Sequence, residues 1–350
     1  MVYGPADESD GPVMKLLVTG GAGFIGSHFI RHMMRRPDVE LIINLDKLTY
    51  AGHLENLQEF SKNKRYRFVR GDIAHVALVE KLVNGLDGII NFAAETHVDR
   101  SIQDAAPFLT TNVLGTQVLL AAALKARVKR FLQISTDEVY GSIPRGAARE
   151  TDVLNPSSPY SASKAAADHL VLSYSITFGL PVLITRAANN YGPYQYPEKF
   201  LPLFITHALN DMPLPLYGDG RNVREWLHVH DHCVAIEQVF RKGKIGQIYN
   251  IGTGRGHGNI DVVKSILKRL DKPESLIRFV TDRPGHDRRY AMSISKMKKE
   301  LGWSPRVNFQ HGLPELIDWY LAHRSWWEPI LHRSKAYRHY YERQYAGKPS

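Results

Sequence analysis

A glycine-rich segment near the start of the chain constrains its fold more than any other feature. The segment VTGGAGFIGS, residues 18–27, follows a short apolar run with β propensity and leads into a stretch with helical apolar spacing. Gly20, Gly23 and Gly26 have the spacing G-x-x-G-x-x-G. Between a strand and a helix, such glycines permit a tight turn, close approach of backbone N–H groups to a pyrophosphate, and close helix–strand packing. The segment therefore predicts a dinucleotide-binding site.

The residues that end the following strands refine this prediction. Asp46 ends the second predicted strand, at about the distance expected for a carboxylate that binds the adenosine ribose. A carboxylate there favours NAD over NADP, because it would repel the additional phosphate of NADP. Asp72 ends the third strand and is a candidate neighbour of the adenine, although a plain strand-end turn is an equally good interpretation. Ala93 and Ala94 end the fourth strand and are small enough to let a cofactor approach.

Strands alternate with helices along the first half of the chain. Predicted strands lie at 15–20, 40–46, 66–72, 88–94, 130–136 and 181–187, and the clearest helices at 27–36, 108–126 and 161–179. This alternation predicts an α/β fold with a doubly wound parallel sheet of the Rossmann type. After Tyr191, Pro and Gly become frequent, and a smaller α+β region is expected, with a strand at 247–254 and a helix at 260–270. The expected organisation is a disordered extension at 1–13, a dinucleotide-binding domain at 14–193, a substrate-binding region at 194–330 and a basic-aromatic tail at 331–350.

Composition excludes some classes of protein and leaves others open. No apolar run approaches the roughly 20 residues of a membrane helix, and the polar N-terminus has no signal-peptide pattern. The single cysteine, Cys233, cannot form an internal disulfide and fits a reducing cytoplasm. The net charge of +10 favours anionic partners, either nucleic acid or a phosphorylated small molecule. The tail after Leu331 mixes basic and aromatic residues; packing on its own domain or on a partner subunit is favoured over nucleic-acid binding.

Two further segments carry residue types that suit acid–base chemistry. The segment ISTDEVYG puts Asp137 and Glu138 directly after a predicted strand, either as a solvated helix start or as an acid and a base for one reaction. The segment YSASK puts Tyr160 and Lys164 on one face of a helix. A phenol has a pKa of about 10, and a nearby ammonium with a positively charged nicotinamide would lower it. Tyr160 would then remove a proton from a sugar hydroxyl.

Together these segments resemble the extended short-chain dehydrogenase/reductase superfamily and, within it, the dTDP-glucose 4,6-dehydratase family. The resemblance runs from about Lys15 to about Ala322 and is carried by the segments TGGAGFIGSH, FAAETHVDRSI, STDEVYG, SPYSASKAAADHLV, NNYGPYQYPEKFLPL, YGDGRNVREWLHVHDH and DRPGHDRRYA. STDEVYG is the most specific, because similar epimerases usually carry small hydroxyl residues or alanine in place of Asp137 and Glu138. The chain departs from the family's usual residues at His53, Ala188, Glu225, His228 and Gly256.

The resemblance implies a dehydration that needs both carboxyl groups. NAD⁺ accepts hydride from C4 of the glucose while Tyr160 takes the hydroxyl proton, and Thr136 hydrogen-bonds the C4 oxygen. Glu138 then removes the acidified C5 hydrogen, and protonated Asp137 donates to the departing C6 hydroxyl. Hydride returns to C6, and the product is a 4-keto-6-deoxy sugar nucleotide. The implied enzyme is a hydro-lyase of deoxysugar biosynthesis that consumes no cofactor.

The resemblance also implies which residues bind each partner, with no metal site. The implied catalytic set is Thr136, Asp137, Glu138, Tyr160 and Lys164. The implied NAD contacts are Gly20, Gly23, Phe24, Ile25, Gly26, Asp46, Lys47, Thr49, Asp72, Ile73, Ala93, Ala94, Tyr160 and Lys164. The implied contacts to dTDP-glucose or UDP-glucose are His97, Asp99, Asn190, Glu198, Lys199, Arg224, Asn259, Arg283 and His286. Arginine forks suit the diphosphate oxygens, and Arg289 is a further cation in the same segment as Arg283.

Three structural and functional expectations remain. Because successive strand residues point to opposite faces, the strand must end near Thr136 for Asp137 and Glu138 to reach one sugar. The long helices that carry Asn112 and Tyr160 are apolar on more than one side, which, with the resemblance, implies a homodimer through a four-helix bundle. The alternatives are a sugar-nucleotide 4-epimerase or decarboxylase of the same superfamily, and a non-catalytic protein that binds NAD or nucleic acid. The acidic pair favours the dehydratase, and neither nucleic acid nor a membrane is an expected partner.

Overall fold

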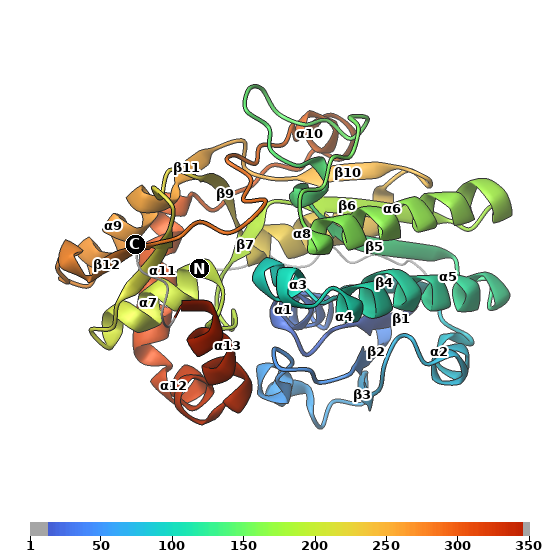
Figure 1. Ribbon diagram of the computed structural model, residues 1–350. Helices are drawn as coiled ribbons and strands as arrows, with labels where there is room; N and C mark the ends of the chain where they lie inside the picture. Colours follow the sequence, from blue (N-terminus) through green and yellow to red (C-terminus); the bar gives the residue numbers. More distant parts are fainter. Residues whose placement is uncertain (1–12, 346–350) are drawn as a thin grey trace.

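A seven-stranded parallel sheet forms the centre of the protein (Figure 1). The structure, a computed structural model, describes residues 13–345, so the extension expected at 1–13 lies outside the described residues except for Val13. The strand order is β10-β6-β5-β4-β1-β2-β3. The strands are β1 (Met14–Thr19), β2 (Val39–Asp46), β3 (Tyr66–Arg70), β4 (Gly88–Asn91), β5 (Arg130–Thr136), β6 (Val182–Ala187) and β10 (Ile248–Ile251). The order reverses between β1 and β4, where doubly wound sheets bind ligands at the carboxyl ends of their strands. The predicted α/β fold class is confirmed.

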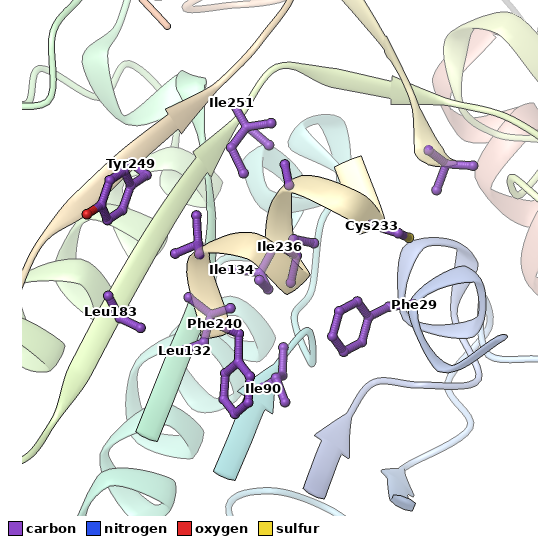
Figure 2. Packing of buried hydrophobic residues seen from close by; sticks show 14 of the residues in the cluster. Phe29, Ile90, Leu132, Ile134, Leu183, Cys233, Ile236, Phe240, Tyr249 and Ile251 are labelled. Atoms are coloured by element: carbon purple, nitrogen blue, oxygen red, sulfur yellow. The ribbon is translucent and has the colours of Figure 1, made fainter. Parts of the chain in front are cut away.

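Helices cover both faces of this sheet, as a parallel sheet requires. They are α1 (Phe24–Met33), α2 (Val76–Val83), α5 (Thr116–Lys125), α6 (Pro159–Phe178) and α8 (Val229–Lys242), with α3 (Val98–Gln103) and the short helices η1 (Leu54–Phe60) and η3 (Asp137–Tyr140) in the loops. On one face, Phe29 of α1 and Ile236 and Phe240 of α8 pack with Ile90 and Leu132 of the strands (Figure 2). Helices α2, α5 and α6 bury their apolar residues on the other face.

The chain crosses back to the large sheet after entering the smaller region. The strand expected at 247–254 was placed in the smaller region, but β10 pairs in parallel with β6 as the edge of the large sheet. Helix α8, which precedes it, packs against α1. The apolar residues of β10 lie after residue 193 in the sequence, but they are buried beside β6 in the large sheet. A single boundary at residue 193 therefore does not separate the two regions of the fold.

The smaller region is α+β and has its own core. Its elements are β7 (Asn189–Tyr191), α7 (Phe200–Leu209), β8 (Leu214–Tyr217), β9 (Val223–His228), β11 (Gly256–Gly258), α9 (Asn259–Arg269), η4 (Glu274–Leu276), β12 (Ile277–Val280) and α11 (Phe309–Ala322), while α10 (Ser295–Leu301) packs on β10. Three strands pair in the order β11-β9-β7, and β12 pairs with β8.

The end of the described chain folds onto the protein as two helices, and the basic-aromatic tail begins within the first of them. Helices α12 (Arg324–Arg333) and α13 (Lys335–Tyr345) lie beside the smaller region, in red in Figure 1. Trp327, Tyr337 and Tyr340 are buried. The indole of Trp326 donates to Asn56 Oδ1 at 3.2 Å, which ties α12 to the large domain. As far as Tyr345, the interpretation that the tail packs on its own chain is correct.

One continuous helical run is both long and apolar. Residues Ala106–Lys125 comprise α4 (Ala106–Phe108), a π-helical turn η2 (Leu109–Gly115) and α5. By length and hydropathy the run could cross a membrane, so the expectation that no apolar run approaches that length was wrong, but half of its apolar window is buried inside the protein. Thr111 on this run lines the large cavity described below. These features are those of a helix that belongs to the protein core.

Candidate active site

The chain leaves the sheet where the acidic pair begins. Thr136 is the last residue of β5 and caps the 3₁₀ helix η3, because its hydroxyl accepts a hydrogen bond from the Glu138 N–H at 3.2 Å. Gly141, at φ 72°, ends that helix. Asp137 and Glu138 therefore leave the alternation of the strand, and both line the same cavity. The predicted break of the strand at this position is confirmed.

The two carboxyl groups lie in a site that favours their neutral forms. Burial, followed by the charges of Glu138 and Glu225, raises the pKa of Asp137 well above its usual value. Burial also raises the pKa of Glu138, although the Arg283 and Arg224 guanidinium groups oppose the shift. Two adjacent carboxyl groups whose environments differ can divide acid and base roles. Asp137, with the stronger upward push, is the better proton donor of the pair.

Helix α6 presents the tyrosine and the lysine to the same cavity. Ser158 caps the helix through a reciprocal bond with Ser161, so that its first turn begins directly before Tyr160. Lys164 Nζ donates to the carbonyl oxygen of Ile134 at 2.6 Å, which fixes the ammonium beside β5. Burial lowers the pKa of Lys164 to about 8.

The protein groups alone shift the pKa of Tyr160 in a different direction from the one expected. A lowered pKa was expected for Tyr160 from the nearby ammonium together with a positively charged nicotinamide. Burial, followed by the charge of Glu138, instead raises the pKa of Tyr160 well above 10, and a hydrogen bond with Thr136 opposes this only in part. The protein groups alone thus keep the phenol protonated, and any deprotonation depends on a further positive charge at the site.

The predicted dinucleotide residues line a cavity of about 330 Å³. All of them are brought together there: Gly20, Gly23, Phe24, Ile25, Gly26, Asp46, Lys47, Thr49, Asp72, Ile73, Ala93, Ala94, Tyr160 and Lys164. A Cβ on Gly26 would lie 2.4 Å from the Gly20 carbonyl oxygen, so only glycine fits. The N-terminus of α1 receives no side-chain cap from Gly23. Its first-turn N–H groups are therefore suited to an anion.

Two acidic residues line this cavity at the ends of β2 and β3. Asp46 Oδ2 accepts the Ala22 N–H at 2.9 Å, and its Oδ1 accepts the Leu48 N–H at 2.8 Å. These bonds hold the carboxylate at the end of β2, between the glycine loop and the next turn. Asp72 pairs with Lys47 at 2.7 Å across the ends of β2 and β3. Asp46 is thus fixed by backbone groups, and Asp72 is already partnered.

The predicted substrate residues gather around an adjoining cavity of about 160 Å³. Its lining includes His97, Asp99, Glu198, Lys199, Arg224, Asn259, Arg283 and His286, while Asn190 lines the larger cavity. Arg283 Nη1 donates to Asp99 at 3.1 Å, and its Nε is buried without a hydrogen-bond partner among the described residues. Glu138 and Lys199 line both cavities, so the two form one continuous site. Arg289 is not part of it, because its guanidinium donates to the carbonyls of Ile143 and Gly146.

Several lining residues were not predicted from the sequence. Tyr217 and Tyr345 enter the smaller cavity from β8 and from the end of α13, and Trp226 from β9 lines both cavities. Tyr290 donates to Asp287 at 2.9 Å and lies 3.4 Å from Glu138 Oε2. No spacing in the sequence connects these aromatic residues, which come from two strands, a loop and the C-terminal helix, so nothing local marked them. Within residues 13–345 no group of His, Cys, Asp and Glu is arranged to hold a metal ion.

Comparison with known proteins identifies the family. Residues 17–316 match the family described as GDP-mannose 4,6 dehydratase. The chain is 51% identical to the dTDP-glucose 4,6-dehydratase of Streptomyces niveus, over 91% of this chain and 96% of the relative. The chain belongs to the dTDP-glucose 4,6-dehydratase family.

The chain is also similar to a glycan biosynthesis protein and to a dehydratase of known structure. The chain is 53% identical to the low-salt glycan biosynthesis protein Agl12 of Haloferax volcanii, over 88% of this chain and 99% of that protein. The crystal structure of DesIV, the dTDP-glucose 4,6-dehydratase of Streptomyces venezuelae, contains NAD. It matches with a TM-score of 0.89 at 50% identity, covering 91% of this chain and all of the other. The large cavity fits that cofactor, because the uncapped start of α1, the glycine at 26 and the fixed Asp46 carboxylate meet in it.

Proposed function

We propose that this chain catalyses the dehydration of dTDP-glucose to the 4-keto-6-deoxy sugar nucleotide, with tightly held NAD⁺ as its cofactor. The observation that carries the proposal is the junction between β5 and η3. There, Asp137 and Glu138 line one cavity with Thr136, Tyr160 and Lys164. A 4-epimerase has no use for an acid at C6, so this pair favours elimination of water. The identity to named dTDP-glucose 4,6-dehydratases supports the same reaction.

The first step uses the residues on α6 and the end of β5. NAD⁺, when bound, supplies reversible oxidation at C4 and reduction at C6 of the sugar. Tyr160 removes the proton of the C4 hydroxyl, and the Thr136 hydroxyl hydrogen-bonds the C4 oxygen. The Lys164 ammonium, held by the Ile134 carbonyl, adds positive charge beside the phenol. The effect of these groups is to develop a ketone at C4.

The elimination uses the acidic pair. A ketone at C4 makes the C5 hydrogen acidic, and Glu138 removes it as general base. Protonated Asp137 donates its proton to the C6 hydroxyl, which leaves as water. Burial favours the protonated form of Asp137, as this role requires. C5 is reprotonated after C6 is reduced, so atoms and charges balance without a consumed co-reactant.

The adjoining cavity binds the anionic end of the substrate. Arg224 and Arg283 hold the diphosphate, with His286 and Asn259 near the nucleoside. Asn190, Glu198 and Lys199 contact the sugar, with His97 and Asp99 at its border. The buried Arg283 Nε and Asn259 Oδ1 have no hydrogen-bond partners among the described residues, and a polar ligand would satisfy them.

The proposal also covers assembly and location. Two copies associate through α5 and α6 as a four-helix bundle, which would cover the exposed Leu109 and Leu114 on η2. Light scattering that finds a stable monomer at micromolar concentration would contradict the dimer. We assign the reaction to the cytoplasm, where a free thiol such as the buried Cys233 stays reduced.

The decisive experiment supplies substrate and nothing else. Purified protein, without added cofactor, is incubated with dTDP-glucose and separately with UDP-glucose, and mass spectrometry follows the loss of one water. Dehydration of dTDP-glucose is expected, with UDP-glucose turned over more slowly. Dehydration of UDP-glucose alone would reassign the nucleotide. No dehydration of either, by protein that retains NAD, would overturn the reaction.

A further inference from the structure

Glu198 occupies an unusual position in the smaller cavity. Its carboxylate is fully buried, and one oxygen, Oε2, accepts two hydrogen bonds from Arg100, from Nε at 3.1 Å and Nη2 at 2.8 Å. The other oxygen, Oε1, has no partner with hydrogen-bond geometry in the described chain. The Tyr50 hydroxyl lies near the same carboxylate: burial, followed by the charge of Glu198, raises the pKa of Tyr50, and a side-chain interaction with Glu198 adds to the shift. A buried carboxylate oxygen without a donor is costly. The geometry therefore leaves Oε1 open to a donor from a ligand.

The guanidinium that holds Glu198 is itself fixed between two aromatic rings. Arg100 lies 4.0 Å from the centre of the Tyr50 ring and 4.7 Å from that of Tyr340. Tyr50 follows β2 in the loop beside the dinucleotide cavity, and Tyr340 belongs to the C-terminal helix α13. Cation–π contacts on two sides restrict rotation of the planar fork. Arg100 thus joins three segments that are distant in sequence.

The hydroxyl group of Tyr340 is also held in place. It donates to Asp99 Oδ2 at 3.1 Å, and Asp99 also accepts from Arg283 and Tyr217. The same helix ends in Tyr345, which lines the smaller cavity. The C-terminal helix is therefore built into the wall of the site, and the network Tyr340–Arg100–Glu198 connects it to the cavity.

We propose that Arg100 is a positioning residue: it orients Glu198 so that Oε1 accepts a hydroxyl of the sugar, and Tyr340 of the C-terminal helix holds Arg100 in place. The inference rests on the proposed function, because it takes the ligand of this cavity to be a nucleotide sugar. It goes beyond that function by adding a residue that does not touch the substrate and a segment, α13, whose role the sequence left open.

The test compares Arg100→Met and Arg100→Lys with a matched control. Arg241 also holds buried carboxylates, those of Asp38 and Glu237, but lies on α8 away from both cavities. The measurements are kcat and KM for dTDP-glucose, and the affinity for dTDP alone. Arg100→Met is expected to lower kcat/KM by about 10- to 100-fold, with unchanged dTDP affinity, because only the sugar contact is lost. Arg241→Met is expected to change thermal stability but not kcat/KM.

Two further measurements separate positioning from folding. Arg100→Lys, which keeps the charge, should recover part of the loss, and Tyr340→Leu should lower kcat/KM about two- to five-fold, whereas Tyr340→Phe keeps the ring and most of the activity. With dTDP-2-deoxyglucose and dTDP-3-deoxyglucose, one analogue lacks the hydroxyl that Glu198 accepts. On that analogue the Arg100→Met penalty should largely disappear.

The outcomes distinguish the inference from the proposed function. Wild-type protein that dehydrates no nucleotide glucose would overturn both. Active wild type would overturn the inference alone in any of three cases: Arg100→Met behaves like Arg241→Met, it weakens dTDP binding as much as it lowers kcat/KM, or its penalty stays complete on both deoxy analogues.

Discussion

The two cavities of this protein are built in different ways. The larger one is formed mainly by short loops at the ends of β1 to β5, where glycines and backbone N–H groups set the shape. The smaller one draws side chains from α3, α7, β8, β9, the loop after β12 and α13. Its walls are held by ion pairs such as Arg100–Glu198 and Arg283–Asp99, and by side-chain hydrogen bonds to backbone carbonyls.

The larger cavity is thus a local structure, built from neighbouring loops, and the smaller one is a distributed structure, built from segments far apart in the sequence. A glycine loop needs only its own strand and helix to bind a pyrophosphate. A cavity for a sugar and its diphosphate needs charges from several segments, and each charge must be partnered while the ligand is absent. The junction of β5 and η3, to which we assign the catalysis, lies where the two meet, since Glu138 lines both cavities. Substitutions in the larger cavity and in the smaller cavity are therefore expected to have different effects on the protein.

The largest effect is expected at the junction itself. Glu138→Gln should lower kcat by about 10²- to 10⁴-fold, because the general base at C5 is lost. In D₂O, mass spectrometry should find no deuterium entering C5 of the sugar. Asp137→Asn is the matched comparison: it should retain exchange at C5 but lose water elimination. Full turnover by Glu138→Gln, or identical behaviour of the two variants, would remove the assigned division of labour.

How far the sequence predicts each cavity follows from the same comparison. The meeting of Gly20, Gly26 and Asp46 at one cavity could be predicted, because the first strand, its loop and helix, and the end of the next strand bring them together locally. The end of β5 at Thr136 could be predicted as well, since two carboxyl groups can reach one ligand only where the strand stops. The return of β10 to the large sheet could not, because a short apolar run pairs wherever an edge is free.

Long-range partners account for the rest. His97, Arg224 and Arg283 were placed by resemblance to a family, and no spacing in the chain connects them. Tyr290 and Tyr345 gave no signal, because a tyrosine in a loop or tail is most often a surface or core residue. The pKa of Tyr160 was expected to fall beside an ammonium and a positively charged nicotinamide, whereas the protein groups alone raise it, mainly by burial, and burial depends on the whole fold.

The next effect tests the local cavity alone. Gly26→Ala would place a methyl group 2.4 Å from the Gly20 carbonyl oxygen, so backbone must move at a cost of about 1–3 kcal/mol. We expect the purified variant to have lost its NAD absorbance and to unfold at lower temperature. Gly23→Ala, whose Cβ would lie 3.3 Å from the same oxygen, should be milder. Equal retention of NAD by Gly26→Ala and wild type would contradict the close approach that defines this cavity.

A smaller effect should appear as a change in pH dependence. Burial lowers the pKa of Lys164 to about 8, and the buried carboxylate of Asp168, which pairs with Arg186 at 2.9 Å, opposes that shift. The protonated lysine is the active form, so kcat should fall as pH rises through about 8. Asp168→Asn removes the opposing charge, so the pKa of Lys164 should fall further and the decline should begin at lower pH. The pH profile of kcat, on protein shown to be folded at each pH, measures this. If the alkaline decline of kcat is unchanged in the variant, Asp168 does not influence the pKa of Lys164.

The smallest effect is expected at Arg288, which lies five positions after Arg283 in one segment. Arg283 is mostly buried in the smaller cavity, whereas Arg288 pairs with Asp219 on the surface, with both side chains more than half exposed. Exposed ion pairs contribute little, so Arg288→Ala should change the KM for dTDP-glucose by no more than about twofold. Arg283→Lys keeps the charge but loses the planar fork, and KM should rise by about tenfold or more. Steady-state kinetics at two salt concentrations checks both. Equal effects would mean that the whole segment, and not its buried arginine, sets the affinity of the distributed cavity.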